Sequence, residues 1–374
     1  MPVRPLLVFG TRPEAIKMAP VVRACHQHNG IAPIVCLTGQ HREMLDQVNS
    51  YFNITADDDL QVMSKNQTLA TLTSKCITGI DSLIERHEPD CVVAQGDTTT
   101  VMAASMVSFY RRIPFVHVEA GLRTGNMQAP WPEEFNRRVV GLTAGLHCAP
   151  TETSAQNLLK EGTPAQFVHV TGNTVIDALL HTVEKERANN DQWDKKYSDL
   201  SGRKMVLITG HRRENFGGGF ENLCHAIRTL AEQFTDTVFC YPVHLNPNVR
   251  EPVNTILGET SNVLLTEPAP YPEFVWLMDR AHVILTDSGG VQEEAPSLKK
   301  PILVMRDTTE RPEALEAGAV ELVGTDRDRI VERVSLLLTN ETEYASRQID
   351  ENPYGDGKAS QRIADLLANR AWEA

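Results

Sequence analysis

Residues 6–14 (LLVFGTRPE) join a short apolar run to a turn that contains Gly10 and Pro13, and this stretch decides the fold class. Residues 283–294 (VILTDSGGVQEE) repeat the arrangement, because an apolar run again breaks into a turn that leads to a helix start. In open α/β sheets, ligands bind outside the carboxyl ends of the strands, and a helix N-terminus offers free N–H groups to an anion. Two such strand ends predict two domains that meet a phosphorylated ligand in a cleft between them.

Short apolar runs alternate with longer helical patterns along the whole chain. In the first half the candidate strands are residues 6–9, 34–37, 91–94, 115–118, 146–149 and 167–170. In the second half they are residues 206–209, 238–241, 263–265, 283–285, 302–304 and 321–323. Apolar residues at helical spacing from Leu69 to Ile84 predict a long helix between the second and third strands. The alternation predicts an α/β fold of right-handed βαβ units, with one Rossmann-like parallel sheet in each half.

The length of 374 residues favours two domains, because single cores stop growing below this size. We expect an N-terminal domain at residues 1–172 and a C-terminal domain at residues 173–357. The polar stretch 184–204 suits a surface helix and a linker. After a turn-rich segment, the last helix (358–374) carries apolar residues on one face, and we expect it to pack back on the N-terminal domain.

Charge and cysteine usage limit the class of protein. The formal net charge of −13 argues against a nucleic-acid backbone as the main partner, while it leaves an anionic small molecule open. The 7 cysteines are scattered without a CxxC pair, which predicts reduced core residues of a cytosolic protein. The chain shows neither a signal peptide nor an apolar stretch of about 18 residues. We therefore expect a cytoplasmic protein without a membrane partner.

Three carboxylates are expected at one rim of the first sheet. Asp97 follows the strand at 91–94, Glu119 follows the strand at 115–118, and Glu133 comes shortly afterwards. Clustered acids allow one carboxyl group to accept a proton while another donates one. The alternative is that Asp97 and Glu119 only cap the helices that follow them, which is the commoner role for either residue taken alone. Arginines and glycines in the same loops favour a ligand site.

Histidines follow two strands of the second half. His211 stands beside Arg212 and Arg213, where it can hold phosphate or sugar oxygens. A solvated basic turn is an equally good interpretation of that spacing. We interpret His244, at the next strand end, as a satisfied histidine at a helix cap.

The turn 288–290 (SGG) is the stronger candidate site. Glycines let the backbone approach a ligand, the serine hydroxyl adds a donor, and Glu294, about one helical turn further on, can accept from ribose hydroxyls. The turn is neither a Walker loop nor GxGxxG, and a plain tight turn is the alternative. Arg311 is a candidate diphosphate contact, with a surface ion pair to Glu310 or Glu313 as its alternative.

Taken together, these motifs closely resemble those of the non-hydrolysing bacterial UDP-N-acetylglucosamine 2-epimerases. They run in order through essentially the whole chain: GTRPEAIKMAP (10–20), GDTTT (96–100), HVEAGLRT (117–124), WPEE (131–134), GNTVID (172–177), HRRE (211–214), DSGGVQEE (287–294) and MRDTTERPE (305–313). The resemblance implies a glycosyltransferase-B-like architecture with the active site between two Rossmann-like domains. It also implies interconversion of UDP-N-acetylglucosamine and UDP-N-acetylmannosamine, which supplies precursors for bacterial surface polysaccharide, and a homodimer whose interface the apolar pattern does not locate.

The resemblance also assigns roles to individual positions. The residues that match catalytic or closely substrate-contacting positions are Arg12, Lys17, Asp97, Glu119, Glu133 and His211. Those that match the positions holding the nucleotide and its phosphates are Phe274, Ser288, Gly289, Gly290, Glu294 and Arg311. Ala269 departs from the glutamine of close relatives, so a uracil contact from that side chain is absent or replaced. We expect neither a cofactor nor a metal.

The implied reaction is elimination of UDP to 2-acetamidoglucal, followed by re-addition with the proton delivered to the other face. We hypothesise that Asp97 and Glu133 exchange the C2 proton, while Glu119 orients the sugar or tunes them. The sequence leaves open which of the two carboxylates serves which face. His211 and Arg311 would stabilise the departing UDP, and the two basic residues near the N-terminus would position it.

Allosteric activation and neighbouring activities are the remaining alternatives. Some members bind a second substrate molecule as an activator, and Gln40 matches part of that site. Glu43 and Asn66 stand where an activated relative has glutamine and arginine, which argues against activation here. Rival functions are a glycosyltransferase of the same architecture, a sugar-nucleotide sensor, a hydrolysing epimerase and an epimerase of a UDP-diacetamido sugar.

Overall fold

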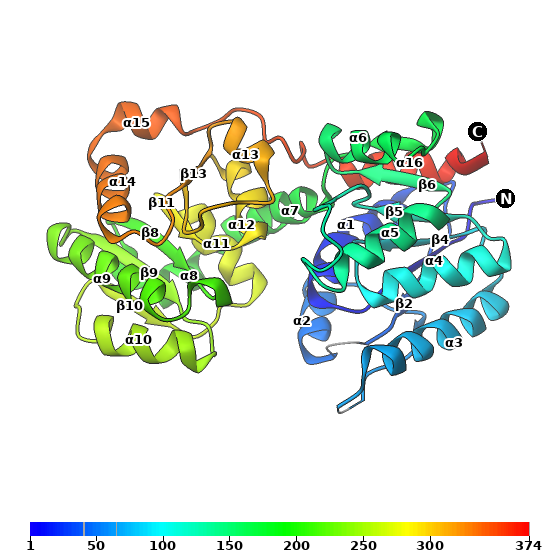
Figure 1. Cartoon of the computed structure of the whole chain (residues 1–374), viewed down its shortest axis with the longest axis horizontal. Coiled ribbons are helices and arrows are strands. Elements are labelled where there is room, and N and C mark those ends of the chain that lie inside the picture. Colours follow the sequence, from blue (N-terminus) through cyan, green and yellow to red (C-terminus); the bar gives the residue numbers. More distant parts are fainter. Residues whose placement is uncertain (40–41, 65, 374) are drawn as a thin grey trace. The chain divides into compact units, whose positions relative to one another are not determined.

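The computed structural model describes residues 1–39, 42–64 and 66–373 and is built around two parallel sheets (Figure 1). The chain divides into two compact units. Unit 1 comprises Met1–Ala178 together with Tyr354–Ala374, and unit 2 comprises Leu179–Pro353. Each unit holds one sheet with helices packed on it, so the expected α/β class with two parallel sheets is confirmed.

The sheet of unit 1 has 7 strands in the order β3-β2-β1-β4-β5-β6-β7, and all neighbouring pairs are parallel. Its strands are β1 (Pro5–Phe9), β2 (Ile34–Leu37), β3 (Asp58–Asp59), β4 (Cys91–Gln95), β5 (Phe115–Val118), β6 (Leu146–Ala149) and β7 (Val168–Val170). The central strands are apolar and fully buried, as expected for a parallel sheet that helices cover on both faces.

The helices of unit 1 form two layers. They are α1 (Arg12–Gln27), α2 (Arg42–Phe52), α3 (Leu69–His87), α4 (Thr99–Arg111), α5 (Glu133–Thr143), α6 (Glu152–Lys160), the first part of α7 (Thr174–Ala188), and α16 (Ala359–Ala368), with 3-10 turns at Ala165–Phe167 and Ala371–Glu373. Helices α3, α4 and α5 lie side by side and bury their apolar faces against β1, β2 and β4 (Figure 1). On the other face, α1 packs on β1 and β4 with α2 and α16 beside it.

The sheet of unit 2 has 6 parallel strands in the order β10-β9-β8-β11-β12-β13. Its strands are β8 (Lys204–Thr209), β9 (Thr237–Pro242), β10 (Val263–Thr266), β11 (Val283–Thr286), β12 (Ile302–Val304) and β13 (Val320–Leu322). Written from the first strand of the unit, this order is that of a Rossmann fold, with the chain reversing its direction of travel between β8 and β11.

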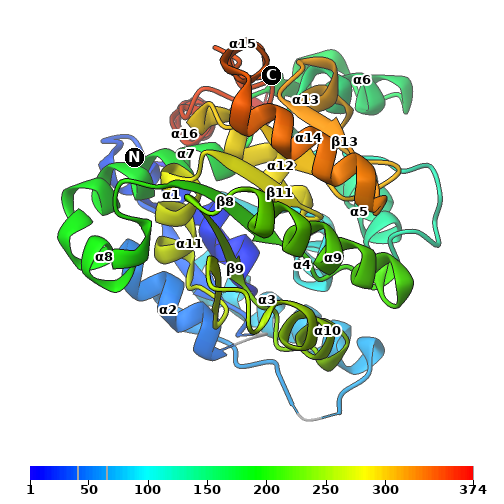
Figure 2. The ribbon, with the colours of Figure 1, turned by 90° about the vertical axis from the view of Figure 1, so that its left-hand side faces the viewer.

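The helices of unit 2 are α8 (Asn190–Lys196), α9 (Gly218–Gln233), α10 (Pro247–Leu257), α11 (Tyr271–Arg280), α12 (Gly289–Glu294), α13 (Pro312–Glu316), α14 (Arg327–Thr339) and α15 (Glu341–Ser346). Shorter 3-10 turns occur at Ser198–Leu200, Arg213–Asn215 and Ala295–Leu298. Helices α9, α10 and α14 lie along one face of the sheet (Figure 2). Phe239 and Tyr241 are among the side chains buried beneath them. The polar stretch after residue 184 contains the end of α7 and the short helix α8, so it is more helical than a simple linker.

The C-terminal segment is tied to unit 1 at the point where it returns from unit 2. Asn173 N–H donates to the Tyr354 carbonyl at 2.7 Å. The buried Asp177 carboxylate accepts from the backbone N–H of Ala359 (3.2 Å) and from both the N–H (2.8 Å) and the hydroxyl (2.6 Å) of Ser360. Asp177 thereby satisfies the first turn of α16, whose apolar face contacts α1.

All 7 cysteines are buried and carry free thiols, as the sequence predicts for core residues. Burial raises the pKa of the Cys76 thiol to about 11, which makes it a poor nucleophile at neutral pH. In the described part of the chain, no helix combines the length and the apolar character that a membrane span requires.

Candidate active site

The predicted site residues gather at the topological switch points of the two sheets. In unit 1 the strand order reverses between β1 and β4, and the loops after these strands carry Arg12 and Asp97. In unit 2 it reverses between β8 and β11, and the loops after these strands carry His211 and Ser288. In open α/β sheets this is where ligands bind, because neighbouring loops diverge there and leave an opening.

Glu14 joins the two switch-point loops of unit 1. Its buried carboxylate accepts the N–H groups of Gly10 (2.9 Å) and Thr11 (2.7 Å), and it accepts the Thr98 hydroxyl at 2.5 Å. Burial raises the pKa of Glu14 despite these hydrogen bonds. A larger residue than glycine would clash at position 10, because its Cβ would lie 1.8 Å from Thr38 Oγ1. The loop that starts α1 at Arg12 is therefore fixed against the loop that carries Asp97.

Glu119 is held in a strained backbone conformation with its carboxylate engaged. Its φ of 63° lies in the left-handed region that non-glycine residues avoid. Lys17 Nζ contacts both carboxylate oxygens, at 2.8 and 2.6 Å, and Gln95 Nε2 donates to Oε2 at 2.6 Å. Glu119 is buried and a turn follows it, so it is no helix cap. The geometry suits a residue that places the ammonium group of Lys17.

Asp97 is likewise not a helix cap, because Thr98 is the N-cap of α4 and accepts from Val101 N–H. The Asp97 carboxylate is paired with Arg137 of α5, whose Nε and Nη2 lie 2.9 and 2.8 Å from Oδ2. Asn136 Nδ2 donates to the Asp97 backbone carbonyl at 2.7 Å. Two successive residues of α5 therefore hold the backbone and the side chain of Asp97.

Helix α5 begins at the half-buried Glu133, and the next residue anchors it. Glu134 is fully buried and accepts the N–H groups of Thr124 (3.1 Å) and Gly125 (3.2 Å). Burial alone would raise the pKa of Glu134, but these bonds and the Arg137 guanidinium lower it instead. Unit 1 thus connects Asp97 to the helix that Glu133 starts.

In unit 2, the buried Asp287 fixes the turn after β8. Its Oδ2 accepts the backbone N–H groups of His211 and Arg212, both at 2.8 Å. The His211 ring has its Nδ1 3.5 Å from Asp287 Oδ1 and stacks on the His244 ring at a centroid distance of 5.3 Å. His244 Nδ1 accepts from the N–H of Asn246, and Asn246, not His244, is the N-cap of α10. His244 therefore lies next to a helix cap, as expected, but it also contacts the His211 ring.

Most of the predicted nucleotide residues converge at the start of α12. Gly289 allows the Arg311 guanidinium to approach, because a Cβ there would lie 3.3 Å from Arg311 Cζ. Arg311 Nε donates to the buried Glu293 at 2.8 Å, and Nη1 lies 3.2 Å from Glu310. This arrangement is more than the surface ion pair considered as an alternative, since the Arg311 side chain is only 19% exposed.

Glu294 and Phe274 lie beside this turn. Glu294 is buried at the end of α12, and Tyr271 Oη lies 3.5 Å from its Oε2. Gly290 stands next to the same carboxylate, because a Cβ at Gly290 would lie 3.6 Å from Glu294 Oε1. Phe274 is half-buried on α11, one turn after Tyr271. Ser288, Gly289, Gly290, Glu294 and Arg311 therefore form one cluster, with Phe274 on the adjoining helix.

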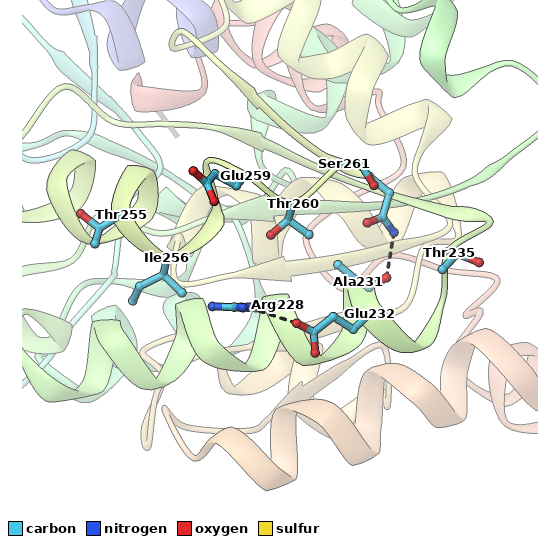
Figure 3. Close-up of a pocket in the computed structure, with 10 residues that line it drawn as sticks. Arg228, Ala231, Glu232, Thr235, Thr255, Ile256, Glu259, Thr260 and Ser261 are labelled. Carbon is cyan, nitrogen blue, oxygen red and sulfur yellow. Dashed lines mark hydrogen bonds and ion pairs between the residues drawn. The ribbon is translucent and has the colours of Figure 1, made fainter.

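Three further hollows lie outside these clusters. One of about 380 Å³ lies between α9, α10 and the loop before β10 and is lined by the Arg228–Glu232 pair and Glu259, among others (Figure 3). Another of about 680 Å³ adjoins Arg306 and Arg329, and a third of about 320 Å³ adjoins Arg23 and Lys358. None of the predicted site residues lines them. Across residues 1–39, 42–64 and 66–373, no group of three or more His, Cys, Asp or Glu residues could hold a metal ion.

Sequence comparison places the chain among known enzymes. The model of a protein family described as UDP-N-acetylglucosamine 2-epimerase matches residues 23–368. The UDP-N-acetylglucosamine 2-epimerase of Escherichia coli K12 is 54% identical over 372 residues, which cover 97% of this chain and 98% of that protein. The chain belongs to the UDP-N-acetylglucosamine 2-epimerase family. The resemblance to the non-hydrolysing bacterial epimerases is thereby confirmed.

Solved structures share the fold over nearly the whole chain. The Neisseria meningitidis UDP-GlcNAc 2-epimerase, solved with UDP-GlcNAc bound, superposes with a TM-score of 0.90 at 50% identity, covering 98% of this chain and 100% of that one. An S. aureus structure with UDP superposes with a TM-score of 0.85 at 43% identity, covering 98% and 96%. The glycosyltransferase-B-like class implied by the motifs is confirmed by these matches.

Sequence reasoning missed the residues that support the site, namely Glu14, Gln95, Glu134, Asn136 and Arg137. For Arg137 a local signal was available, because it follows Glu133 by four residues and so shares a helix face with it. For Glu14 a local signal was also present, because Thr11 and Glu14 have the spacing of a capping box. The contact of Glu14 with Thr98 and that of Gln95 with Glu119 join different parts of the chain, so no local pattern predicts them. Gln40 lies outside the described residues, and the side chain of Glu43 is likewise not described.

Proposed function

We propose that this protein interconverts UDP-N-acetylglucosamine and UDP-N-acetylmannosamine by inverting C2 of the sugar. The observation that carries the proposal is a set of acidic residues after two neighbouring strands of unit 1 in a member of the epimerase family: Asp97 follows β4, and Glu119 and Glu133 follow β5. The Neisseria relative solved with UDP-GlcNAc supports the choice of substrate.

The reaction proceeds by elimination and re-addition. One carboxylate takes the C2 proton, the C–H electron pair becomes the C1=C2 bond of 2-acetamidoglucal, and the C1–O pair leaves with UDP. A carboxyl group on the other face then returns a proton to C2 as the UDP oxygen attacks C1, and the two acids regain their starting states by exchange with water. Asp97 and Glu133 are the proposed pair, because inversion removes the C2 proton from one face of the sugar and returns a proton to the other, which calls for a proton-exchanging group on each face.

The basic residues of unit 1 have a positioning role in this proposal. Lys17 is oriented by Glu119, whose carboxylate also accepts from Gln95, and Arg12 starts α1, so both basic residues lie on the helix that follows β1. In unit 2, Ser288, Gly289, Gly290, Glu294 and Phe274 hold the nucleotide. His211 and Arg311 stabilise the negative charge of the departing diphosphate. Ala269 offers no side-chain amide to uracil, so backbone groups would have to supply that contact.

The test is to incubate the protein with UDP-N-acetylglucosamine alone in deuterated buffer and to follow the sugar by proton NMR. We expect UDP-N-acetylmannosamine to appear with deuterium at C2, without any acceptor, until both epimers reach equilibrium. A requirement for an acceptor would identify a glycosyltransferase, and release of free N-acetylmannosamine would identify a hydrolysing enzyme. Binding without conversion would leave only a sensor and would overturn the proposal. A parallel incubation with a UDP-diacetamido sugar tests the remaining alternative.

We further propose that the protein is a homodimer formed through a patch on unit 1, the α4–α5 patch, which consists of Phe109, Tyr110 and Leu142. Their relative exposures are 61%, 70% and 86%, although all three are apolar or aromatic and lie on neighbouring helices. Exposed Arg112 and Glu85 flank them. A two-fold axis through the patch would bury the apolar side chains and bring opposite charges together.

Leu142→Glu tests this interface, because a carboxylate buried at a symmetry axis meets its own copy. We expect sedimentation equilibrium to show the parent as a dimer and the variant as predominantly a monomer at micromolar concentration. Leu69→Glu is the matched control, since Leu69 is also exposed on a helix of unit 1 but lies outside the patch. A monomeric parent, or a variant that dimerises as the parent does, would contradict the proposed interface.

The free cysteines are suited to a reducing compartment, and we place the enzyme in the cytoplasm on that ground.

A further inference from the structure

Helix α5 contacts only one of the two carboxylate oxygens of Asp97. Arg137 directs two nitrogens, Nε and Nη2, at the same oxygen, Oδ2. The other oxygen, Oδ1, accepts no hydrogen bond from the residues that the structure describes. Arg137 therefore fixes Oδ2 of Asp97, while Oδ1 is available to another group.

The Arg137 guanidinium that contacts Asp97 is itself held by a buried residue. The Arg137 side chain is only 13% exposed, and its third nitrogen, Nη1, contacts the fully buried Glu134 at 3.1 Å. Glu134 is in turn anchored to the backbone of Thr124 and Gly125. Asn136 fixes the Asp97 carbonyl from the next position on the same helix. The guanidinium is thus held from one side by a buried carboxylate and has no freedom to swing away from Asp97.

We propose that Arg137 is the positioning residue that aims Asp97 at the sugar, with Oδ2 fixed by the guanidinium and Oδ1 left to exchange the C2 proton. The inference rests on the proposed function, because it needs Asp97 to act on C2. Arg137 does not touch the substrate in this scheme and acts only through Asp97. Because Glu133 begins the helix that carries Arg137, one element sets the positions of both proposed acid/base groups.

The geometry also explains why arginine stands at this position. A planar guanidinium offers nitrogens in a fixed fork, so it can hold Asp97 and Glu134 at once. A lysine would supply the same charge from a single nitrogen and could not span both carboxylates. Misplacement of a catalytic group by about 1 Å costs about 100-fold in rate.

The test compares Arg137→Met with Arg138→Met in the full-length protein. Arg138 is on the same helix and contacts Glu134 (3.5 Å) and Glu161, but it does not contact Asp97. We expect Arg137→Met to lower kcat and the rate of deuterium incorporation at C2 by about 100-fold, with the Kd for UDP within twofold of the parent and an unchanged circular dichroism spectrum. Arg138→Met should retain the rate of the parent, and Arg137→Lys should fall between the two.

A double-mutant cycle with Asp97→Asn separates positioning from general damage. If Arg137 acts through Asp97, adding Arg137→Met to Asp97→Asn should change the residual exchange rate less than about threefold. Additive losses in the double variant, or equal losses in Arg137→Met and Arg138→Met, would overturn the inference. If Asp97→Asn alone exchanged C2 at the parent rate, the proposed function of Asp97 would fail first, which distinguishes the two failures.

Discussion

Asp97→Asn and Glu133→Gln should each lower kcat for epimerisation by about 100- to 10,000-fold, the contribution expected of a general acid or base. Each amide keeps the shape of the side chain but can no longer accept and return a proton. Because the nucleotide is held by residues of unit 2 in our proposal, the Kd for UDP should stay within about threefold of the parent, and isothermal titration checks this. The variants therefore separate chemistry from binding.

Deuterium exchange distinguishes the two carboxylates. In deuterated buffer, starting from each epimer separately, the variant that lacks the base for one sugar should still release some glycal from the other. Glu152→Gln is the matched control for Glu133→Gln, because Glu152 is also the first residue of a helix and is exposed. Unchanged exchange in both Asp97→Asn and Glu133→Gln would reject the proposed pair.

Unit 1 should lose stability steeply as the pH falls below about 6.5, because it buries two histidines in the neutral form. Burial lowers the pKa of His117 to about 3 and that of His147 to about 4, and these residues are adjacent on β5 and β6. His117 Nε2 lies 2.7 Å from the Gly96 carbonyl, so the neutral ring donates to the loop that carries Asp97.

The direction of the pH dependence follows from the number of protons that the folded and unfolded states bind. Between pH 6.5 and about 4, the unfolded chain binds protons at both histidines while the folded protein does not, so acid favours unfolding. Each histidine contributes a slope of about 1.4 kcal/mol per pH unit, and together they should remove roughly 4 kcal/mol of unfolding free energy between pH 7 and pH 5. Above about pH 7.5 the contribution of the two histidines to the unfolding free energy should be constant.

Urea unfolding followed by circular dichroism at pH 7, 6 and 5 measures this loss. His147→Gln should reduce the slope of the unfolding free energy against pH by the contribution of one histidine. His26→Gln, at an exposed position of α1, is the control and should show the slope of the parent. If His147→Gln unfolds too readily at pH 7 to be compared, a direct NMR titration of the parent histidines gives the same answer. A folded-state pKa near 6.5 for both rings would contradict the prediction.

The positions of the strands along the chain were largely predicted from the sequence, because parallel strands buried on both faces appear as short apolar runs. Strand β3 was missed since Asp58 and Asp59 are acidic, and only the register opposite Cys36 and Leu37 makes them a strand. The expected strand at 167–170 starts one residue later, because Phe167 belongs to a 3-10 turn. The long helix expected from Leu69 extends to His87, where Glu88 in the left-handed conformation ends it.

The positions of the candidate site residues were accessible because turns after parallel strands must meet at one edge. Their partners were not, since those contacts join residues that are far apart in sequence. Arg137 is forty positions from Asp97, and Lys17 is still further from Glu119. The spacing of Arg137 from Glu133 indicates a shared helix face but not a contact with Asp97, and no local pattern indicates the contact between Lys17 and Glu119. The capping interpretation of Asp97 was excluded only by the observation that Thr98 is the N-cap.

The return of the C-terminal segment to unit 1 has a consequence for biosynthesis. Unit 1 is discontinuous in the chain, because all of unit 2 lies between Ala178 and Tyr354. On the ribosome, where segments emerge in order at about 5–20 residues per second, unit 2 is synthesised before α16 can be added. The Asp177 carboxylate therefore lacks its partners in α16 until that helix has left the exit tunnel, so unit 1 completes its core only after unit 2 has been synthesised.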